Sequence, residues 1–148
     1  MNTRGFIVSH DPECIFCKIL EGAIPAFKLY EDDDTFAFMD INPLHDGHAL
    51  VIPKEHHTNI FETPTEVLTT LMATTQRIAK AVQNSIAPDG INILQANGHG
   101  AAQSVFHIHF HVLPRKNGDD AKLNWGLRPG DKDHIEQLAD KIRAAISD

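Results

Sequence analysis

Three histidines alternate with apolar residues in the stretch Phe-His-Ile-His-Phe-His-Val-Leu, which occupies residues 106–113. Alternation with a period of two predicts a β-strand that has one face on the core. His107, His109 and His111 then share the other face, with neighbouring histidines about 6.6–6.8 Å apart. Imidazole titrates near neutral pH and serves as a nucleophile, a proton carrier or a metal ligand. We therefore expect this strand to carry the chemistry of the protein.

The loop that leads into this strand favours phosphate chemistry over a metal site. Residues 95–104 read Gln-Ala-Asn-Gly-His-Gly-Ala-Ala-Gln-Ser, and such small residues let backbone amides approach a ligand closely. Gln103 and Ser104 suit phosphate oxygens better than they suit a metal ion. Phosphoryl or nucleotidyl transfer is the favoured interpretation. Hydrolysis at a metal held by a His-x-His pair is the alternative.

Both cysteines of the chain lie together, as Cys14 and Cys17 in a Cys-x-x-Cys arrangement. This spacing does not indicate a disulfide framework, and in an intracellular chain it indicates metal or redox chemistry. A redox motif would follow a strand in a βαβ unit, a pattern that the sequence lacks. Zinc needs about four ligands, so two would have to be histidines. A pair of packed thiols without a metal is the alternative.

Composition restricts the partners of the protein. A chain of 148 residues is expected to form one domain, and 20 acidic against 13 basic residues give a formal charge of −7. Such a surface repels DNA and RNA, whereas a small nucleotide can still be held locally by backbone amides and histidine. Residues 1–13 do not resemble a signal peptide, and no run is long enough to span a bilayer. We expect a cytoplasmic protein that does not bind a membrane.

The elements that must position these residues follow from periodicity and turn signals. Neighbouring strands are joined mainly as hairpins, which predicts an α+β fold with an antiparallel sheet of about five strands. Thr63, Pro64 and Glu66 predict a capped start for the long helix, with Thr63 as the cap. We expect helices over residues 14–20, 64–86 and 131–146, and strands over residues 27–30, 35–39, 48–52, 91–94 and 106–113.

The histidine strand resembles the signature of the histidine triad (HIT) family, His-φ-His-φ-His-φ-φ, in which φ is apolar. The similarity extends to residues 36–43, 47–54 and 103–105. Residues 14–19 look like the opening of the bacterial Hint-like members. The resemblance covers roughly residues 14–115, and the triad in this wider context is a specific signal. It implies a single HIT-like domain over residues 1–148.

The resemblance implies chemistry at the α-phosphorus of a nucleotide. His109, the middle histidine, would be the nucleophile and form a nucleotidyl-histidine that water then cleaves. His107 and His111 would help to neutralise charge on the phosphoryl oxygens, with His111 in contact with the phosphate. Ser104 and Gln103 would lie near the phosphate and the leaving group.

The nucleoside contacts come from the same resemblance. Asp40 would hold the ribose hydroxyls, and Ile41 would pack near the base. His48 looks like a fourth histidine that lines the site, although a half-buried histidine at a strand end is equally consistent with its position. Asn97 is the nearest amide to a position that here falls on Ala96.

For the metal, the resemblance implies a structural zinc ion held by Cys14, Cys17, His56 and His107, with His57 as the neighbouring alternative to His56. A closed Cys₂His₂ set leaves no position for water. It also implies a homodimer, in which Trp125 is a candidate interface residue. The leading hypothesis is a purine nucleoside phosphoramidase or nucleotidyl hydrolase. The alternatives are a diadenosine polyphosphate hydrolase and a zinc-stapled nucleotide-binding or protein-interaction module with little activity.

Overall fold

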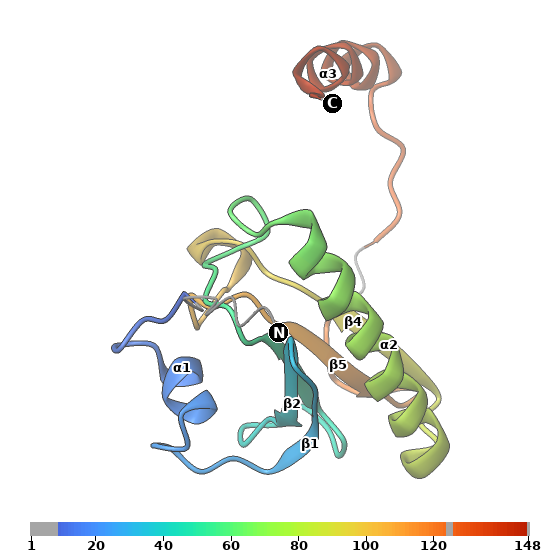
Figure 1. Ribbon diagram of the computed structural model, residues 1–148. Helices are drawn as coiled ribbons and strands as arrows, with labels where there is room; N and C mark the ends of the chain where they lie inside the picture. The colour runs from blue at the N-terminus through green and yellow to red at the C-terminus, as the bar shows by residue number, and fades with distance from the viewer. Residues whose placement is uncertain (1–8, 124–125, 148) are drawn as a thin grey trace.

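Residues 9–123 and 126–147 are described by a computed structural model. Their five strands form one sheet in the order β1-β2-β3-β5-β4, in which every neighbouring pair is antiparallel (Figure 1). The predicted α+β class is therefore confirmed. The elements are α1 (Ile15–Leu20), β1 (Lys28–Glu31), β2 (Thr35–Met39), β3 (Ala49–Pro53), α2 (Thr65–Ile86), β4 (Gly90–Leu94), the 3₁₀ turn η1 (His99–Ala101), β5 (Phe110–Arg115) and α3 (Lys132–Ala145).

Each face of the sheet is covered by a different helix, because residues along each strand alternate between the faces. The long helix α2 covers one face, and the short helix α1 lies against the other (Figure 1). In β3, Val51 packs with the α2 cluster, whereas Leu50 and Ile52 pack with Phe16 of α1. Leu50 pairs with His111 in the neighbouring strand, so His111 lies on the α1 side.

The histidine strand starts later than the sequence predicted. β5 begins at Phe110, and residues 105–107 form a bend. The ladder with β3 starts at the pair Val51–Phe110, and the N–H of Ile108 donates instead to the carbonyl of His57 at 2.7 Å. Phe106 is consequently 38% exposed rather than in the core. The prediction of a strand over residues 106–109 was wrong because the ladder stops at that pair although β3 continues to Pro53: the backbone of Ile108 bonds outside the sheet, and residues 105–107 bend away.

The start of α2 also differs from the prediction. Pro64 is the N-cap and no side chain caps the helix. The Thr63 hydroxyl donates to the carbonyl of Asn59 at 2.6 Å, so it is not available as a cap. The expected capping box is therefore absent, and the helix depends on burial of Leu71, Ile78 and Val82 against the sheet.

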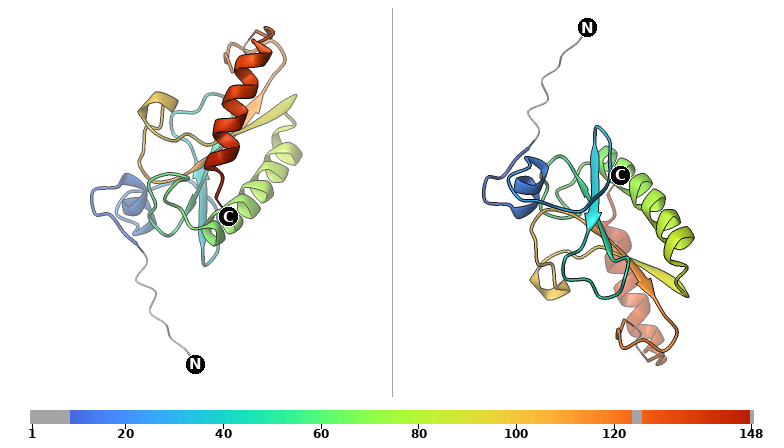
Figure 2. Two further views of the ribbon diagram at one scale, coloured as in Figure 1. Left: turned by 90° about the horizontal axis from the view of Figure 1, so that it is seen from above. Right: turned by 90° about the horizontal axis from the view of Figure 1, so that it is seen from below.

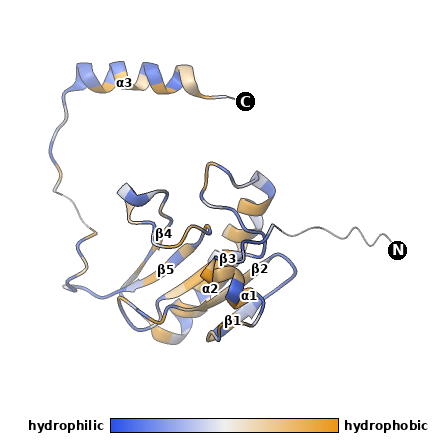
Figure 3. Ribbon diagram, turned by 90° about the vertical axis from the view of Figure 1, so that its left-hand side faces the viewer, coloured by the Kyte–Doolittle hydropathy of each residue, from blue (hydrophilic) through white to orange (hydrophobic). Residues whose placement is uncertain are grey.

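The helix α3 stands away from the sheet in Figures 1 and 3, whereas in the views from above and below in Figure 2 it is projected onto the other elements. Asp131 caps it by accepting from the N–H groups of Asp133 and His134, as polar side chains at a helix start do. None of its residues is buried. In Figure 3 apolar residues interrupt an otherwise hydrophilic helix, and Ile135, Leu138 and Ile142 are 42–65% exposed. Among the described residues, no helix combines the length and the hydropathy that a membrane crossing requires.

Candidate active site and metal site

A cluster of two thiols and two imidazoles joins α1 to the sheet. Cys14 and Cys17 flank the first turn of α1, where Cys14 is the N-cap. His107 Nδ1 lies 3.5 Å from Cys14 Sγ and 3.6 Å from Cys17 Sγ. His56 Nδ1 lies 3.4 Å from Cys17 Sγ and 3.1 Å from His107 Nδ1. All four donor atoms lie within 4.8 Å of one another.

The hydrogen bonds around this cluster turn a lone pair of His107 inward. His107 Nε2–H donates to the carbonyl of Pro53 at 2.9 Å, which leaves Nδ1 without a proton in the neutral ring. Burial lowers the pKa of His107 to about 4, so the ring is neutral at pH 7. Burial also raises the pKa of Cys17 to about 11, so the thiol loses its proton only when a cation compensates the charge. Two thiols and two imidazoles are a fitting donor set for zinc.

The middle histidine, His109, is buried with one tautomer fixed by the backbone. His109 Nδ1–H donates to the carbonyl of His107 at 2.8 Å, and this bond leaves the lone pair on Nε2. The ring is only 4% exposed, and its burial lowers the pKa of His109, which keeps it neutral. Phe16 packs edge-on against the ring, with centroids 5.1 Å apart. A neutral imidazole with a fixed tautomer is the form that can attack phosphorus.

His48 and His111 form a donor chain beside His109. The backbone N–H of Leu44 donates to His48 Nδ1 at 3.0 Å, so the neutral ring carries its proton on Nε2. That Nε2–H donates to His111 Nδ1 at 2.9 Å, and the proton of His111 is then on Nε2. Asp40 Oδ2 lies 3.4 Å from His48 Nε2. Burial lowers the pKa of His48 and brings that of His111 to about 4.

A cavity of about 280 Å³ connects these groups with α1. Its apolar wall comes from α1 and from the sheet face that α1 covers, and the polar groups His109, His111, Ser104 and Asp40 also line it. The apolar lining includes Ile15, Phe16, Ile19, Phe38, Ile41 and Leu50. An apolar slot that ends in imidazoles and a carboxylate suits a base, a sugar and a phosphate in that order.

The structure does not bring all the predicted residues to this cavity. Gln103 is buried, and its amide holds three backbone groups, those of Thr58, Gly98 and Val105. Asn97 bonds the side chain of Gln95 and the N–H of Ile60. Neither lines the cavity, and their roles in nucleotide binding stay predictions.

Phe16 is a residue of the site that the sequence analysis did not single out. It contacts the rings of His107 and His109, with centroid distances of 5.8 and 5.1 Å. A signal was present, because Phe16 lies inside the Cys-x-x-Cys segment and a metal bound there would carry it to the histidine strand. The N–H of Leu44 gave no signal, since any residue at that position supplies one.

Comparisons with known proteins agree with the motifs. Residues 21–118 match the family model of the HIT domain. The adenosine 5'-monophosphoramidase HNT1 of Saccharomyces cerevisiae is 39% identical over 137 residues, which cover 92% of this chain and 84% of that protein.

Solved structures resemble the whole fold. SMU.412c from Streptococcus mutans has a TM-score of 0.90 at 39% identity and covers 95% of this chain and 90% of its own. A zinc-bound histidine triad family protein from Mycobacterium smegmatis has a TM-score of 0.71 at 38% identity, with coverage of 90% and 98%.

Proposed function

The chain belongs to the HIT family, and from this premise we propose that it is a nucleotide hydrolase or transferase that acts at the α-phosphorus of a purine nucleoside phosphoramidate. The observation that carries the proposal is the His109 ring, whose Nδ1–H is fixed on the His107 carbonyl at 2.8 Å in a cavity shared with His111. The similarity to an adenosine 5'-monophosphoramidase supports the substrate class.

The reaction proceeds in two displacements at phosphorus. His109 Nε2 attacks the α-phosphorus, the phosphorus–nitrogen bond breaks, and the amine leaves with the bonding electrons and takes up a proton. Water then attacks the nucleotidyl-histidine, His109 leaves as a neutral imidazole, and the nucleoside monophosphate is released with loss of a proton. His111 Nε2–H donates to a phosphoryl oxygen in both steps, which stabilises the developing charge.

The remaining polar groups bind and orient the substrate. The carboxylate of Asp40 accepts from the ribose hydroxyls, and Ile41 covers the base. Ser104, which lines the same cavity, contacts the phosphate in this proposal. His48 acts through His111, whose tautomer it sets by donating to Nδ1. Gln103 shapes the phosphate loop through its bonds to the backbone.

The cluster of Cys14, Cys17, His56 and His107 is proposed to hold a structural zinc ion. The inward lone pair of His107 and the two thiols fit the ion, which supplies a positive charge that compensates two thiolates. His57 is the weaker ligand candidate because its Nε2 pairs with Glu55 at 2.9 Å. A zinc-bound relative supports the assignment. Ligands that must stay reduced agree with a cytoplasmic location.

A mass measurement tests the nucleophile. The protein is incubated with adenosine phosphoramidate, quenched in acid-free denaturant within the first turnover, and examined by intact mass. An adduct of one adenylyl group on the wild type, absent from His109→Ala, supports the covalent mechanism. Turnover by His109→Ala at the wild-type rate contradicts it. Tight binding without adduct or product identifies a binding module instead.

The substrate class is tested by competition. Phosphoramidate and a diadenosine polyphosphate are supplied together, and the ratio of kcat/KM values is read from the two products. A ratio that favours the phosphoramidate supports the proposal. A ratio that favours the dinucleotide assigns the protein to the alternative activity with the same histidine.

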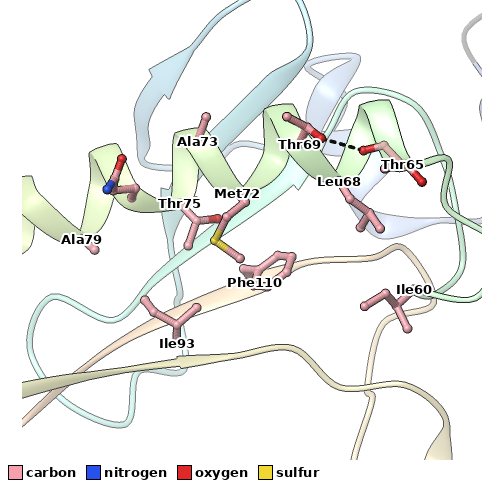
Figure 4. Close-up of a pocket in the computed structure, with 11 residues that line it drawn as sticks. Ile60, Thr65, Leu68, Thr69, Met72, Ala73, Thr75, Ala79, Ile93 and Phe110 are labelled. Carbon is pink, nitrogen blue, oxygen red and sulfur yellow. Dashed lines mark hydrogen bonds between the residues drawn. The ribbon is translucent and has the colours of Figure 1, made fainter. Parts of the chain in front are cut away.

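A second copy of this chain is the protein partner that the surface supports best. An apolar groove of about 760 Å³ lies between α2 and the sheet, lined by Leu68, Met72, Ile93 and Phe110 among others (Figure 4). Each copy also exposes an apolar stripe on α3, formed by Ile135, Leu138 and Ile142. In a two-fold pair the stripe of each copy covers the groove of the other, so both features of both copies are buried at once.

Light scattering on the purified chain tests this arrangement. Met72→Glu places a charge in the groove and is expected to shift the protein from dimer to monomer. Leu29→Glu is the matched control, because Leu29 and Met72 are both 46% exposed and Leu29 lies on β1, away from the groove. A monomeric wild type, or equal dissociation of the two variants, contradicts the proposal.

A further inference from the structure

Asp119 lies outside the nucleotide cavity, in the turn after β5, and is held by several donors. Its carboxylate accepts from Arg115 Nε at 2.7 Å and Arg115 Nη2 at 2.6 Å. It also accepts from the backbone N–H groups of Lys116 at 3.0 Å and Ala121 at 3.2 Å. The side chain is only 5% exposed. The result is a fixed anion at the end of β5.

Arg115 ties this anion to the edge of the sheet. Its Nη1 donates to Asn92 Oδ1 on β4 at 2.7 Å, and its Nη2 also donates to the carbonyl of Ala121 at 2.8 Å. A guanidinium with all three nitrogens engaged has little freedom to rotate. Since β5 carries both Arg115 and His111, Asp119 is fixed relative to the strand that holds His111.

His45 brings the loop between β2 and β3 to this anion. Its Nε2 lies 3.1 Å from Asp119 Oδ2, and the nitrogen is buried without an aligned hydrogen bond. The two side chains are therefore in direct contact at this point. The same loop packs tightly at Gly47, which has a φ of +88° and where a Cβ would lie 3.1 Å from Ile86 and 3.3 Å from Pro114. The loop is held at two points.

This loop determines the tautomer of His48. The N–H of Leu44 donates to His48 Nδ1 at 3.0 Å, and the carbonyl of His45 accepts the N–H of His48 at 3.1 Å. A displaced loop would withdraw the donor from Nδ1, and the ring could then protonate either nitrogen. The Nε2–H that His48 donates to His111 would no longer be the only form.

We infer that Asp119 is a positioning residue for His48. The anion holds His45, His45 holds the loop, and the loop presents the Leu44 N–H that fixes the His48 ring toward His111. The catalytic consequence rests on the proposed function, in which His48 acts through His111. The positioning itself does not, because it concerns a tautomer that can be observed without substrate.

Nitrogen NMR of ¹⁵N-histidine-labelled protein, combined with kinetics, tests the inference. Asp119→Asn replaces the carboxylate with a neutral amide, and His45→Leu removes the contact while leaving the Arg115–Asp119 pair intact, so one variant remains informative if the other fails to fold. We expect His48 to change from a single Nε2–H form to a mixture in both variants. We expect kcat to fall roughly 10-fold with KM unchanged, as for a misoriented group.

Asp46→Asn is the control, since it removes a neighbouring charge from an exposed position in the same loop. An unchanged His48 signal in folded Asp119→Asn and His45→Leu overturns the inference, as does an equal change in Asp46→Asn. A changed signal with an unchanged kcat upholds the positioning role and refutes the part of the proposed function that passes through His48.

Discussion

Two histidine clusters of this protein meet at residues 107–109: the metal cluster, which is the proposed zinc site of Cys14, Cys17, His56 and His107, and the proposed catalytic cluster of His48, His109 and His111. In both, the backbone fixes which nitrogen of a neutral imidazole carries the proton. The Pro53 carbonyl turns the lone pair of His107 toward two thiols and the Nδ1 atom of His56. The Leu44 N–H instead starts a chain of hydrogen bonds. It donates to His48 Nδ1, and His48 Nε2–H donates in turn to His111 Nδ1.

The difference determines which charge each cluster attracts. Lone pairs that converge repel one another and are stabilised by a cation, whereas a donor chain that ends in a free N–H is stabilised by an anion. His107 and His111, four residues apart, can thus serve a metal ion and a phosphate. The His107 carbonyl, which accepts from His109, connects the two clusters.

The largest expected effect comes from a substitution at His109, the proposed nucleophile, which should lower turnover but leave the metal cluster intact. His109→Asn removes the attacking nitrogen but retains an N–H that can bond the His107 carbonyl. Turnover of adenosine phosphoramidate should fall by on the order of 10⁴-fold or more, as for other nucleophiles. Zinc content by elemental analysis and the melting temperature should stay close to those of the wild type. Loss of zinc in this variant would show that the clusters are not separable.

The converse substitution is Cys17→Ser, which acts on the metal cluster alone. The oxygen is a poor zinc ligand, so elemental analysis should show well below one zinc per chain. The free energy of unfolding should fall by about 3–5 kcal/mol, because the metal holds α1 on the sheet. Turnover at a temperature where the variant is folded should fall less than in His109→Asn. A full zinc complement would refute the ligand set.

The sequence predicted the sheet and the neighbourhood of both clusters, because alternation, turns and motifs are local signals. It could not divide the three histidines correctly into strand and non-strand residues. Their separation depends on the bond from Ile108 N–H to the His57 carbonyl, which replaces the ladder with β3, and on the bond from the His107 ring to the Pro53 carbonyl. These contacts join residues about fifty positions apart, and no local pattern encodes them.

The same limit applies to the residues that set tautomers. Leu44 acts through its backbone N–H, and Asp119 acts through His45, so neither side chain type points to the active site. Gln103 shows the reverse case. Its position in the motif predicted a phosphate contact, whereas its buried amide is used by the backbone of three loop residues.

A smaller effect is expected on the pH dependence of stability, to which each cluster contributes a buried histidine. Burial brings the folded-state pKa values of His107 and His111 to about 4, against 6.5 for an ordinary histidine. A histidine whose pKa is lower in the folded than in the unfolded protein makes its full contribution to the free energy of unfolding above pH 6.5. That contribution is lost as the pH falls toward 4. In metal-free protein, denaturant unfolding should therefore give a free energy that decreases from pH 7 to pH 5. His111→Asn should reduce the slope, and an unchanged slope would assign it to other groups.

The smallest effect is expected from His57, and it identifies the fourth ligand. His56 Nδ1 lies 3.4 Å from Cys17 Sγ, whereas the ring of His57 pairs with Glu55 and only its backbone carbonyl serves the histidine segment. His57→Ala keeps that carbonyl and removes no proposed ligand or substrate contact, so zinc content and turnover should change by less than about 2-fold. His56→Ala, the matched variant one residue earlier, should lose zinc. If the two results are reversed, His57 is the ligand, and the segment after β3 must then be turned so that its ring replaces that of His56 beside His107.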